Sequence, residues 1–308
     1  MAHNNLLIPA SLTLPQPGQL CAWGQLLGAS TAIAAAELAA QVDAPILLLA
    51  DEPRQADQFE SGIRFFCDSD IDVRHFIEWE TLPWDSFSPH QDIISERLSI
   101  LATMRDMRSG IVIASAPSLL QRLPPVDYVA ARSLSLRTGQ TLPREAFIDS
   151  LTAAGYFRVP QVGEHGEFAV RGSLIDVFPM GSTKPIRIDF LDDDIESLRH
   201  FSTETQLSGE IITSVDVLPA REIPLDADSV KGFRERYRER FEGQPAKSRV
   251  YREISDGIAH GGIEYYLPLF FESTANLIDY LPQNSIVLAP QSLQSVMQQT
   301  WAEIEERY

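Results

Sequence analysis

A glycine-containing segment near the N-terminus has the outline of a phosphate-binding loop. It has the sequence GQLLGAST over residues 24–31 and directly precedes an Ala-rich helical stretch, where backbone N–H groups could hold an anion. Hydrolysis of a nucleotide would also need a lysine for the terminal phosphates and a hydroxyl for magnesium. Ala29 or Ser30 fills the lysine position, and the chain has no lysine before Lys184. We therefore expect a degenerate loop that only starts a helix, formed by Gly28, Ala29, Ser30 and Thr31.

Two neighbouring carboxylates follow an apolar run and have the look of an acidic magnesium motif. Asp51 and Glu52 come directly after the run from Ala44 to Ala50, about twenty residues beyond the loop, which is early for that motif. A solvated strand end is the favoured interpretation. The six histidines and two cysteines show no His-x-x-x-His or Cys-x-x-Cys spacing, so we expect no metal site.

Two arginines are expected to lie on one face of a β-sheet. Alternation in the run PIRIDFLDD places Arg187 and Leu191 on the same face, and alternation in EFAVRG turns Arg171 outward. Arginines beside an aliphatic residue are typical of a docking patch for carboxylates. The alternative is a solvated sheet face on which the arginines form cross-strand salt bridges to Asp189 or Glu167.

A basic segment runs from Lys231 to Arg252, with eight lysines and arginines against three glutamates. It could contact nucleic acid or a protein partner. The aromatic residues Phe233, Tyr237 and Phe241 form a separate stripe at helical spacing, so no aromatic platform is expected to face the charges. A solvated helix face is therefore favoured.

The first part of the chain is expected to form a parallel sheet covered by helices, because short aliphatic strands alternate with helical stretches. The predicted strands are 46–50, 73–77 and 110–114, and the predicted helices are 31–42, 54–66 and 93–107. A Pro- and aromatic-rich segment lies between them. Its aromatics are interpreted as core plugs or a loop staple and comprise Trp79, Trp84 and Phe87.

The pattern changes near Leu134 to closely spaced β runs, which indicates an α+β module with an antiparallel sheet. One helix, 144–154, precedes the runs EFAVRG, SLIDVFP, PIRIDFLDD, SLRHFS and IITSVDVLP. Beyond Leu218 follow the basic helix, a last strand at 285–289 and a last helix at 292–308. The chain ends within helical sequence, which suggests a piece of a longer protein.

The 308 residues carry a formal net charge of −18. This acidity argues against an autonomous nucleic-acid binder. The two cysteines are too few for a disulfide framework, the N-terminal residues 1–18 lack the features of a signal peptide, and the longest apolar run is far shorter than a membrane span. We expect a reduced, cytoplasmic monomer.

Four ordered blocks of sequence carry a resemblance to a known family. They are WETLPWDSFSPHQDIISERLS at 79–99, AGYFRVPQVGEHGEFAVRGSLIDVFPMGS at 154–182, IRIDFLDDDIESLRHF at 186–201 and GGIEYYLPLFF at 261–271. Together they resemble the N-terminal module of the bacterial transcription-repair coupling factor family, Mfd. That module is itself similar to the excision-repair protein UvrB.

The resemblance implies an α/β fold in which a helicase-like parallel-sheet domain is split in sequence and carries an inserted α+β domain with an antiparallel sheet. The split domain would comprise residues 1–132 and 219–308, and the inserted domain residues 133–218.

The resemblance also shows what this chain lacks. The phosphate loop of UvrB ends in Gly-Lys-Thr, and its acidic motif follows a strand that matches 285–289, where this chain continues with Pro-Gln-Ser. The aromatic hairpin with which UvrB probes damaged DNA is also missing. The resemblance therefore implies no enzyme and no cofactor in this chain, with ATP, magnesium and DNA translocation belonging to later domains of the full-length family protein.

The inserted domain of these families docks onto UvrA. The resemblance implies a non-catalytic module that binds UvrA and recruits nucleotide excision repair to stalled RNA polymerase, with polymerase and DNA bound by other domains. Alternation turns Phe190 inward, so Leu191 is the better apolar contact. Two other functions stay open, a UvrB-like nucleotide-hydrolysing helicase core acting on damaged DNA and a DNA clamp through the basic segment. The implied UvrA contacts are Arg171, Arg187, Phe190, Leu191 and Arg199, with Arg158 as a weaker addition.

Overall fold

The computed structural model describes residues 16–24, 26–67 and 70–307. The expectation about a signal peptide falls mainly on residues 1–15, which lie outside the described residues. Among the described residues, none of the helices combines the length and the apolar character that crossing a membrane requires. The chain divides into two compact units, the first made of residues 1–77, 104–120 and 281–306 and the second of residues 78–103, 121–280 and 307–308.

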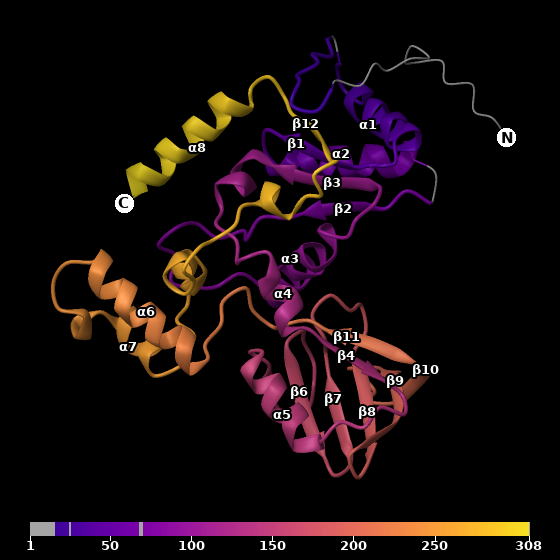
Figure 1. Ribbon diagram of the computed structural model, residues 1–308, viewed down its shortest axis with the longest axis vertical. Coiled ribbons are helices and arrows are strands. Elements are labelled where there is room, and N and C mark those ends of the chain that lie inside the picture. Colours follow the sequence, from indigo (N-terminus) through magenta and orange to yellow (C-terminus); the bar gives the residue numbers. More distant parts are fainter. Residues whose placement is uncertain (1–15, 25, 68–69, 308) are drawn as a thin grey trace. The chain divides into compact units, whose positions relative to one another are not determined.

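The first unit contains a four-stranded parallel sheet with the strand order β12-β1-β3-β2 (Figure 1). All residues of the two central strands are buried, as expected for aliphatic runs covered on both faces. The last strand returns from the far end of the sequence and pairs with β1 in parallel. The strand bounds are β1 Pro45–Ala50, β2 Val73–Phe76, β3 Gly110–Ser115 and β12 Ile286–Leu288.

Two helices pack on this sheet and on each other. Small side chains let them approach closely, since a Cβ added at Gly62 would lie 2.9 Å from the Cβ of Ala32. Ala35, Leu38 and Ile63 of these helices are buried in one cluster with the aliphatic strand residues. The helices of this unit are α1 Ser30–Gln41, α2 Pro53–Phe66, the short 3₁₀ helix Ala116–Leu120 and α8 Leu293–Arg307.

The second unit contains a six-stranded sheet with the order β10-β9-β8-β7-β6-β5, and Figure 1 shows α5 (Arg144–Ala153) lying against it. Phe147 of α5 packs on Phe190 of the sheet with ring centroids 6.2 Å apart. All pairs are antiparallel except β5 with β6. The strand bounds are β5 Phe157–Arg158, β6 Glu167–Arg171, β7 Leu174–Val177, β8 Ile186–Leu191, β9 Asp194–Phe201 and β10 Ser208–Ile212.

The predicted single run IITSVDVLP is wrong, because the structure divides it between two sheets. Its first part belongs to β10 and pairs with β9, whereas β11 (Ser214–Val217) pairs with β4 (Leu134–Arg137) in a separate two-stranded sheet. Each half finds its partner in a different part of the chain, so the chain changes sheets at Thr213. One parallel sheet, strands paired antiparallel and several helices agree with the broad prediction of an α/β protein. The likeness to a helicase and the predicted domain boundaries stay predictions.

The helical part of the second unit encloses an aromatic cluster that includes Phe233, Tyr237, Tyr251 and Phe270. The carboxylate of Asp226 caps the basic helix by accepting a hydrogen bond from the backbone N–H of Ser229. The helices are α3 Gln91–Met104, α4 Asp127–Arg132, α6 Ala227–Arg240 and α7 Arg249–Ser255, with 3₁₀ turns at Pro245–Lys247, Ile263–Leu269 and Leu277–Tyr280.

The aromatics of the Pro-rich segment have different positions. Trp79 is buried and packs edge-on against Tyr265 at 5.4 Å, so it is a core plug as expected. Trp84 and Phe87 are half exposed, at 50% and 57%, so of the two predicted roles the core plug is wrong for them and the loop staple stays a prediction. The segment is held by close backbone contact, because a Cβ at Gly262 would collide with the carbonyl oxygen of Asp85.

Candidate functional site

The predicted contact arginines share one face of the six-stranded sheet. The strand register makes one row of direct cross-strand neighbours from Asp176 through Arg187 and Arg199 to Ile211. Arg171 lies in the adjoining row, because its cross-strand partner on β7 is two residues away from Asp176 and therefore lies on the same face. Alternation along β8 places Leu191 on the same face as Arg187. The structure therefore brings Arg171, Arg187, Leu191 and Arg199 onto one surface.

Arg187 is a structural residue of this face. Its Nε and Nη2 atoms donate to the two carboxylate oxygens of Asp176 at 2.7 and 2.9 Å, and its guanidinium lies 4.9 Å from the ring centroid of Phe201. Asp176 is 1% exposed, and its hydrogen bond raises the pKa of the Arg187 guanidinium. The arginine's own side chain is 13% exposed. The ion pair with buried Asp176 is bidentate and thus occupies Nε and Nη2 of the Arg187 guanidinium, which are then not free to bind a partner.

The cross-strand partner of Arg187 differs from both predicted partners. The register sets Asp176 directly opposite it, whereas Asp189 accepts from the hydroxyl of Ser173 at 3.0 Å. The carboxylate of Glu167 accepts backbone N–H bonds at 2.8 and 3.0 Å from a turn that precedes its strand. The prediction of salt bridges to these two carboxylates is therefore wrong.

Arg171 is the exposed cation of the face. It forms no ion pair with any residue that the structure describes, and its Nη2 donates only to the carbonyl oxygen of Pro160 and to Oε1 of Gln206, both at 3.3 Å. Such weak bonds leave its guanidinium able to receive a carboxylate from a partner.

The apolar residues of the face divide as alternation predicted. Leu191 is 63% exposed, whereas Phe190 is buried beneath the sheet. Arg199 is half-buried and Arg158 is exposed. Ile211, 60% exposed beside Arg199, was missed from the sequence because a bulge between Ser208 and Ile211 breaks the alternation that would have marked it.

The degenerate loop leads directly into α1. Gly28 takes a left-handed conformation with a φ of 58°, and the hydroxyl of Ser30 donates to the carbonyl oxygen of Leu27 at 2.8 Å. Asp51 is half-buried, and the hydroxyl of Ser292 donates its one hydrogen to the Asp51 carboxylate, with Oγ 2.8 and 2.7 Å from the two carboxylate oxygens. The prediction of a merely solvated strand end is wrong for Asp51, which joins the end of β1 to the residue that directly precedes α8. Among the described residues, no three acidic, His or Cys side chains gather as a metal site would require.

The basic segment also differs from its prediction in one respect. Tyr251 faces the charges of α6: its hydroxyl lies 3.5 Å from Nε of Arg234, and Arg238 lies 5.7 Å from its ring centroid. The predicted separation of charges and aromatics holds for Phe233 and Tyr237, which are buried. The arginines therefore flank an aromatic core rather than forming an isolated stripe.

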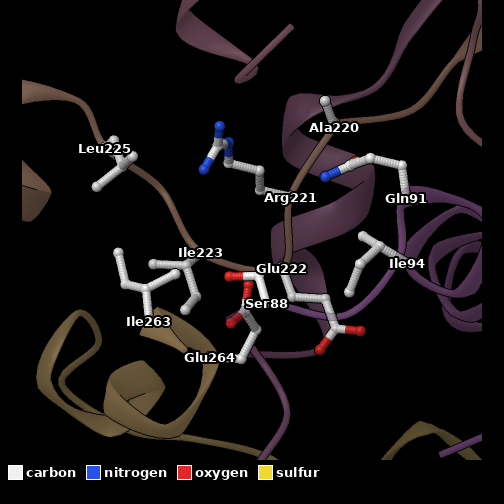
Figure 2. Close-up of a pocket in the computed structure, with 10 residues that line it drawn as sticks. All are labelled: Ser88, Gln91, Ile94, Ala220, Arg221, Glu222, Ile223, Leu225, Ile263 and Glu264. Carbon is white, nitrogen blue, oxygen red and sulfur yellow. The ribbon is translucent and has the colours of Figure 1, made fainter. Parts of the chain in front are cut away.

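A small pocket in the second unit is lined by residues of two of the sequence blocks (Figure 2). Figure 2 shows the hydroxyl of Ser88 beside the carboxylate of Glu264. Oε2 of Glu264 is buried without a hydrogen-bond partner, and burial raises the pKa of this carboxyl group. The neighbouring Glu222 is bound to Arg97. Sequence patterns gave no signal for this pocket, because its lining comes from three distant segments.

The antiparallel sheet lies within a region that matches a known family. Residues 134–223 match the UvrB interaction domain, so this chain contains a domain of that class.

Similarity to complete proteins extends over nearly the whole chain. The chain is 39% identical to the transcription-repair-coupling factor of Escherichia coli (strain K12) over 298 residues, which cover 96% of this chain and 26% of the relative. The corresponding protein of Haemophilus influenzae is 38% identical, covering 95% and 26%, and that of Bacillus subtilis 24% identical, covering 85% and 23%. The chain spans about a quarter of the length of these relatives. It belongs to the transcription-repair-coupling factor family as its N-terminal, UvrB-like module, which confirms the resemblance seen in the sequence blocks.

Proposed function

We propose that this chain is a non-catalytic docking module that binds UvrA and so recruits nucleotide excision repair to stalled RNA polymerase. The observation that carries the proposal is the exposed Arg171, which has no ion-pair partner among the described residues and lies on one sheet face with the exposed Leu191. Carboxylates of UvrA would pair with the arginine, while an apolar group would cover the leucine. RNA polymerase and DNA would be bound by other parts of the full-length protein.

The absence of catalysis is part of this proposal. No lysine stands at the phosphate loop, and the hydroxyl of Ser30 is bound to its own turn. Phosphoryl transfer would lack the cation and the metal ligand that stabilise its developing charge. We therefore assign no cofactor to this chain. A UvrB-like hydrolysing core remains the competing function, and nucleotide binding by the isolated chain would distinguish the two.

The test is a titration of the chain against UvrA, comparing wild type with Arg171→Glu. Reversing a contact cation should weaken binding by roughly 10- to 100-fold. Arg122→Glu is the matched control, because Arg122 is also exposed and lies outside the sheet. Arg187→Glu is unsuitable, since it would place two carboxylates together at buried Asp176. Absence of wild-type binding, or equal loss in the control, would contradict the proposal.

A further inference from the structure

Gln206 contacts Arg171 and Arg187 of this sheet face and lies in the loop from β9 to β10. Its backbone φ is 59°, in the left-handed region that residues other than glycine rarely occupy. A non-glycine side chain in this conformation makes a specific role for that side chain a reasonable hypothesis.

The polar groups of Gln206 tie its loop to both arginines. Its carbonyl oxygen accepts from Nη1 of Arg187 at 3.1 Å, and its side-chain Oε1 accepts from Nη2 of Arg171 at 3.3 Å. Its side-chain Nε2 donates to the carbonyl oxygens of Thr203 at 2.8 Å and Val162 at 3.4 Å. The amide oxygen is thereby oriented toward Arg171.

Arg187 holds this loop from the other side. Besides its pair with Asp176, its Nη1 donates to the hydroxyl of Ser208 at 2.9 Å as well as to Gln206. All three nitrogens of the guanidinium therefore have acceptors within the protein. This arrangement differs from that of Arg171, whose contacts are two bonds of 3.3 Å on a single nitrogen.

We infer that the residues of this face have different roles. Arg171 contacts the partner, and Gln206, whose loop is held by Arg187, is a positioning residue for Arg171. The inference rests on the proposed binding of UvrA. A neutral acceptor on Nη2 favours one orientation of the guanidinium and leaves its charge and its remaining N–H groups for a partner carboxylate. Holding the side chain in place before binding reduces the entropy lost on association.

A double-mutant cycle tests the inference, with UvrA affinity measured for wild type, Gln206→Ala, Arg171→Ala and the double variant. We expect Gln206→Ala to weaken binding several-fold in the wild-type background and to have almost no effect once Arg171 is alanine. Arg171→Ala should also reduce the dependence of the association rate on salt, whereas Gln206→Ala should leave it unchanged.

Two further variants separate positioning from folding. Gln206→Gly suits the left-handed backbone but lacks the amide, so it should keep the melting temperature and bind as Gln206→Ala does. Gln206→Glu should weaken binding further, because its carboxylate would neutralise Arg171. Equal effects of Gln206→Ala in both arginine backgrounds would overturn the inference while leaving the UvrA proposal intact. If the wild-type chain did not bind UvrA, both would fail.

Discussion

The guanidinium of Arg97 and the carboxylate of Glu222 form an ion pair in the interior of the second unit, with Nε and Oε1 2.6 Å apart. Neither side chain is more than 1% exposed. The indole of Trp79 lies 4.9 Å from the guanidinium and donates to the same carboxylate at 3.4 Å. The pair therefore joins the sequence block 79–99, which contains Arg97, to the segment that contains Glu222 and follows the six-stranded sheet.

Breaking this pair should strongly destabilise the chain. Glu222→Gln removes the charge that neutralises a buried guanidinium, which should lower the free energy of unfolding by about 3–5 kcal/mol. Replacing both partners, as Arg97→Met with Glu222→Leu, should be milder than Glu222→Gln alone. Urea denaturation measures both. The i,i+4 pair Arg249–Glu253, whose arginine is 76% exposed, is the control, and Arg249→Ala should have a far smaller effect than Glu222→Gln. Similar losses at both sites would contradict the prediction.

Glycine at position 262 is needed for close packing as well as for its backbone conformation. Gly262 has a φ of 79°, and an added Cβ would collide with the carbonyl oxygen of Asp85. Gly139 has nearly the same φ, 80°, and open space around it. Gly262→Ala should therefore lower the melting temperature well beyond Gly139→Ala, which pays only the conformational strain of roughly 1–2 kcal/mol. Equal shifts in a thermal melt would show that the clash is relieved without cost.

The pH dependence of stability should carry a contribution from Glu264. Burial raises the pKa of its carboxyl group above the ordinary 4.5, so the folded chain binds this proton more tightly than the unfolded chain. Its favourable contribution is complete below that ordinary pKa and is lost as pH rises through the raised one. Glu264→Gln abolishes the titration, so the variant should gain stability relative to wild type as pH increases above 4.5.

Urea denaturation at several pH values between about 3 and 7 measures this difference and also covers the range below 4.5 in which the control titrates. Glu253→Gln is a control of opposite sign. The pKa of Glu253 is lowered by hydrogen bonds from Arg249 and His260, so its contribution is lost as pH falls. Parallel pH profiles for wild type and Glu264→Gln would exclude a buried, titrating carboxyl at this position.

The isolated chain should not respond to nucleotide. Because the loop at residues 28–31 lacks a lysine, magnesium-ATP should leave the melting temperature unchanged and should not be hydrolysed above background. An authentic phosphate-loop ATPase is the positive control for both assays. A saturable rise in melting temperature with ATP would instead favour the competing hydrolysing function.

Alternation along a strand predicted which side chains lie on each face, but it could not identify their partners. The outward Leu191 and inward Phe190 follow from the local period of β8. The ion pair between Arg187 and Asp176 depends on the register between two strands, which is set by the packing of the whole sheet. Local patterns therefore locate a face and leave its hydrogen-bond network undetermined.

Irregular backbone was the other source of error. Gln206 gives no sequence signal, because its left-handed conformation is stabilised by bonds from residues far along the chain. The change of sheets at Thr213 similarly depends on β4, which lies some eighty residues earlier. Long-range contacts of this kind override the propensities on which sequence-based prediction relies.

The pairing of β12 with β1 has a consequence for how the protein is made. A long stretch of chain separates Ile46 from its neighbour Ile286, so one side of β1 has no strand partner until Ile286 has left the ribosome. The residues of the second unit up to Tyr280 are synthesised before that pairing is possible. Because loops this long close slowly, the parallel sheet should become resistant to proteolysis later in synthesis than the second unit does.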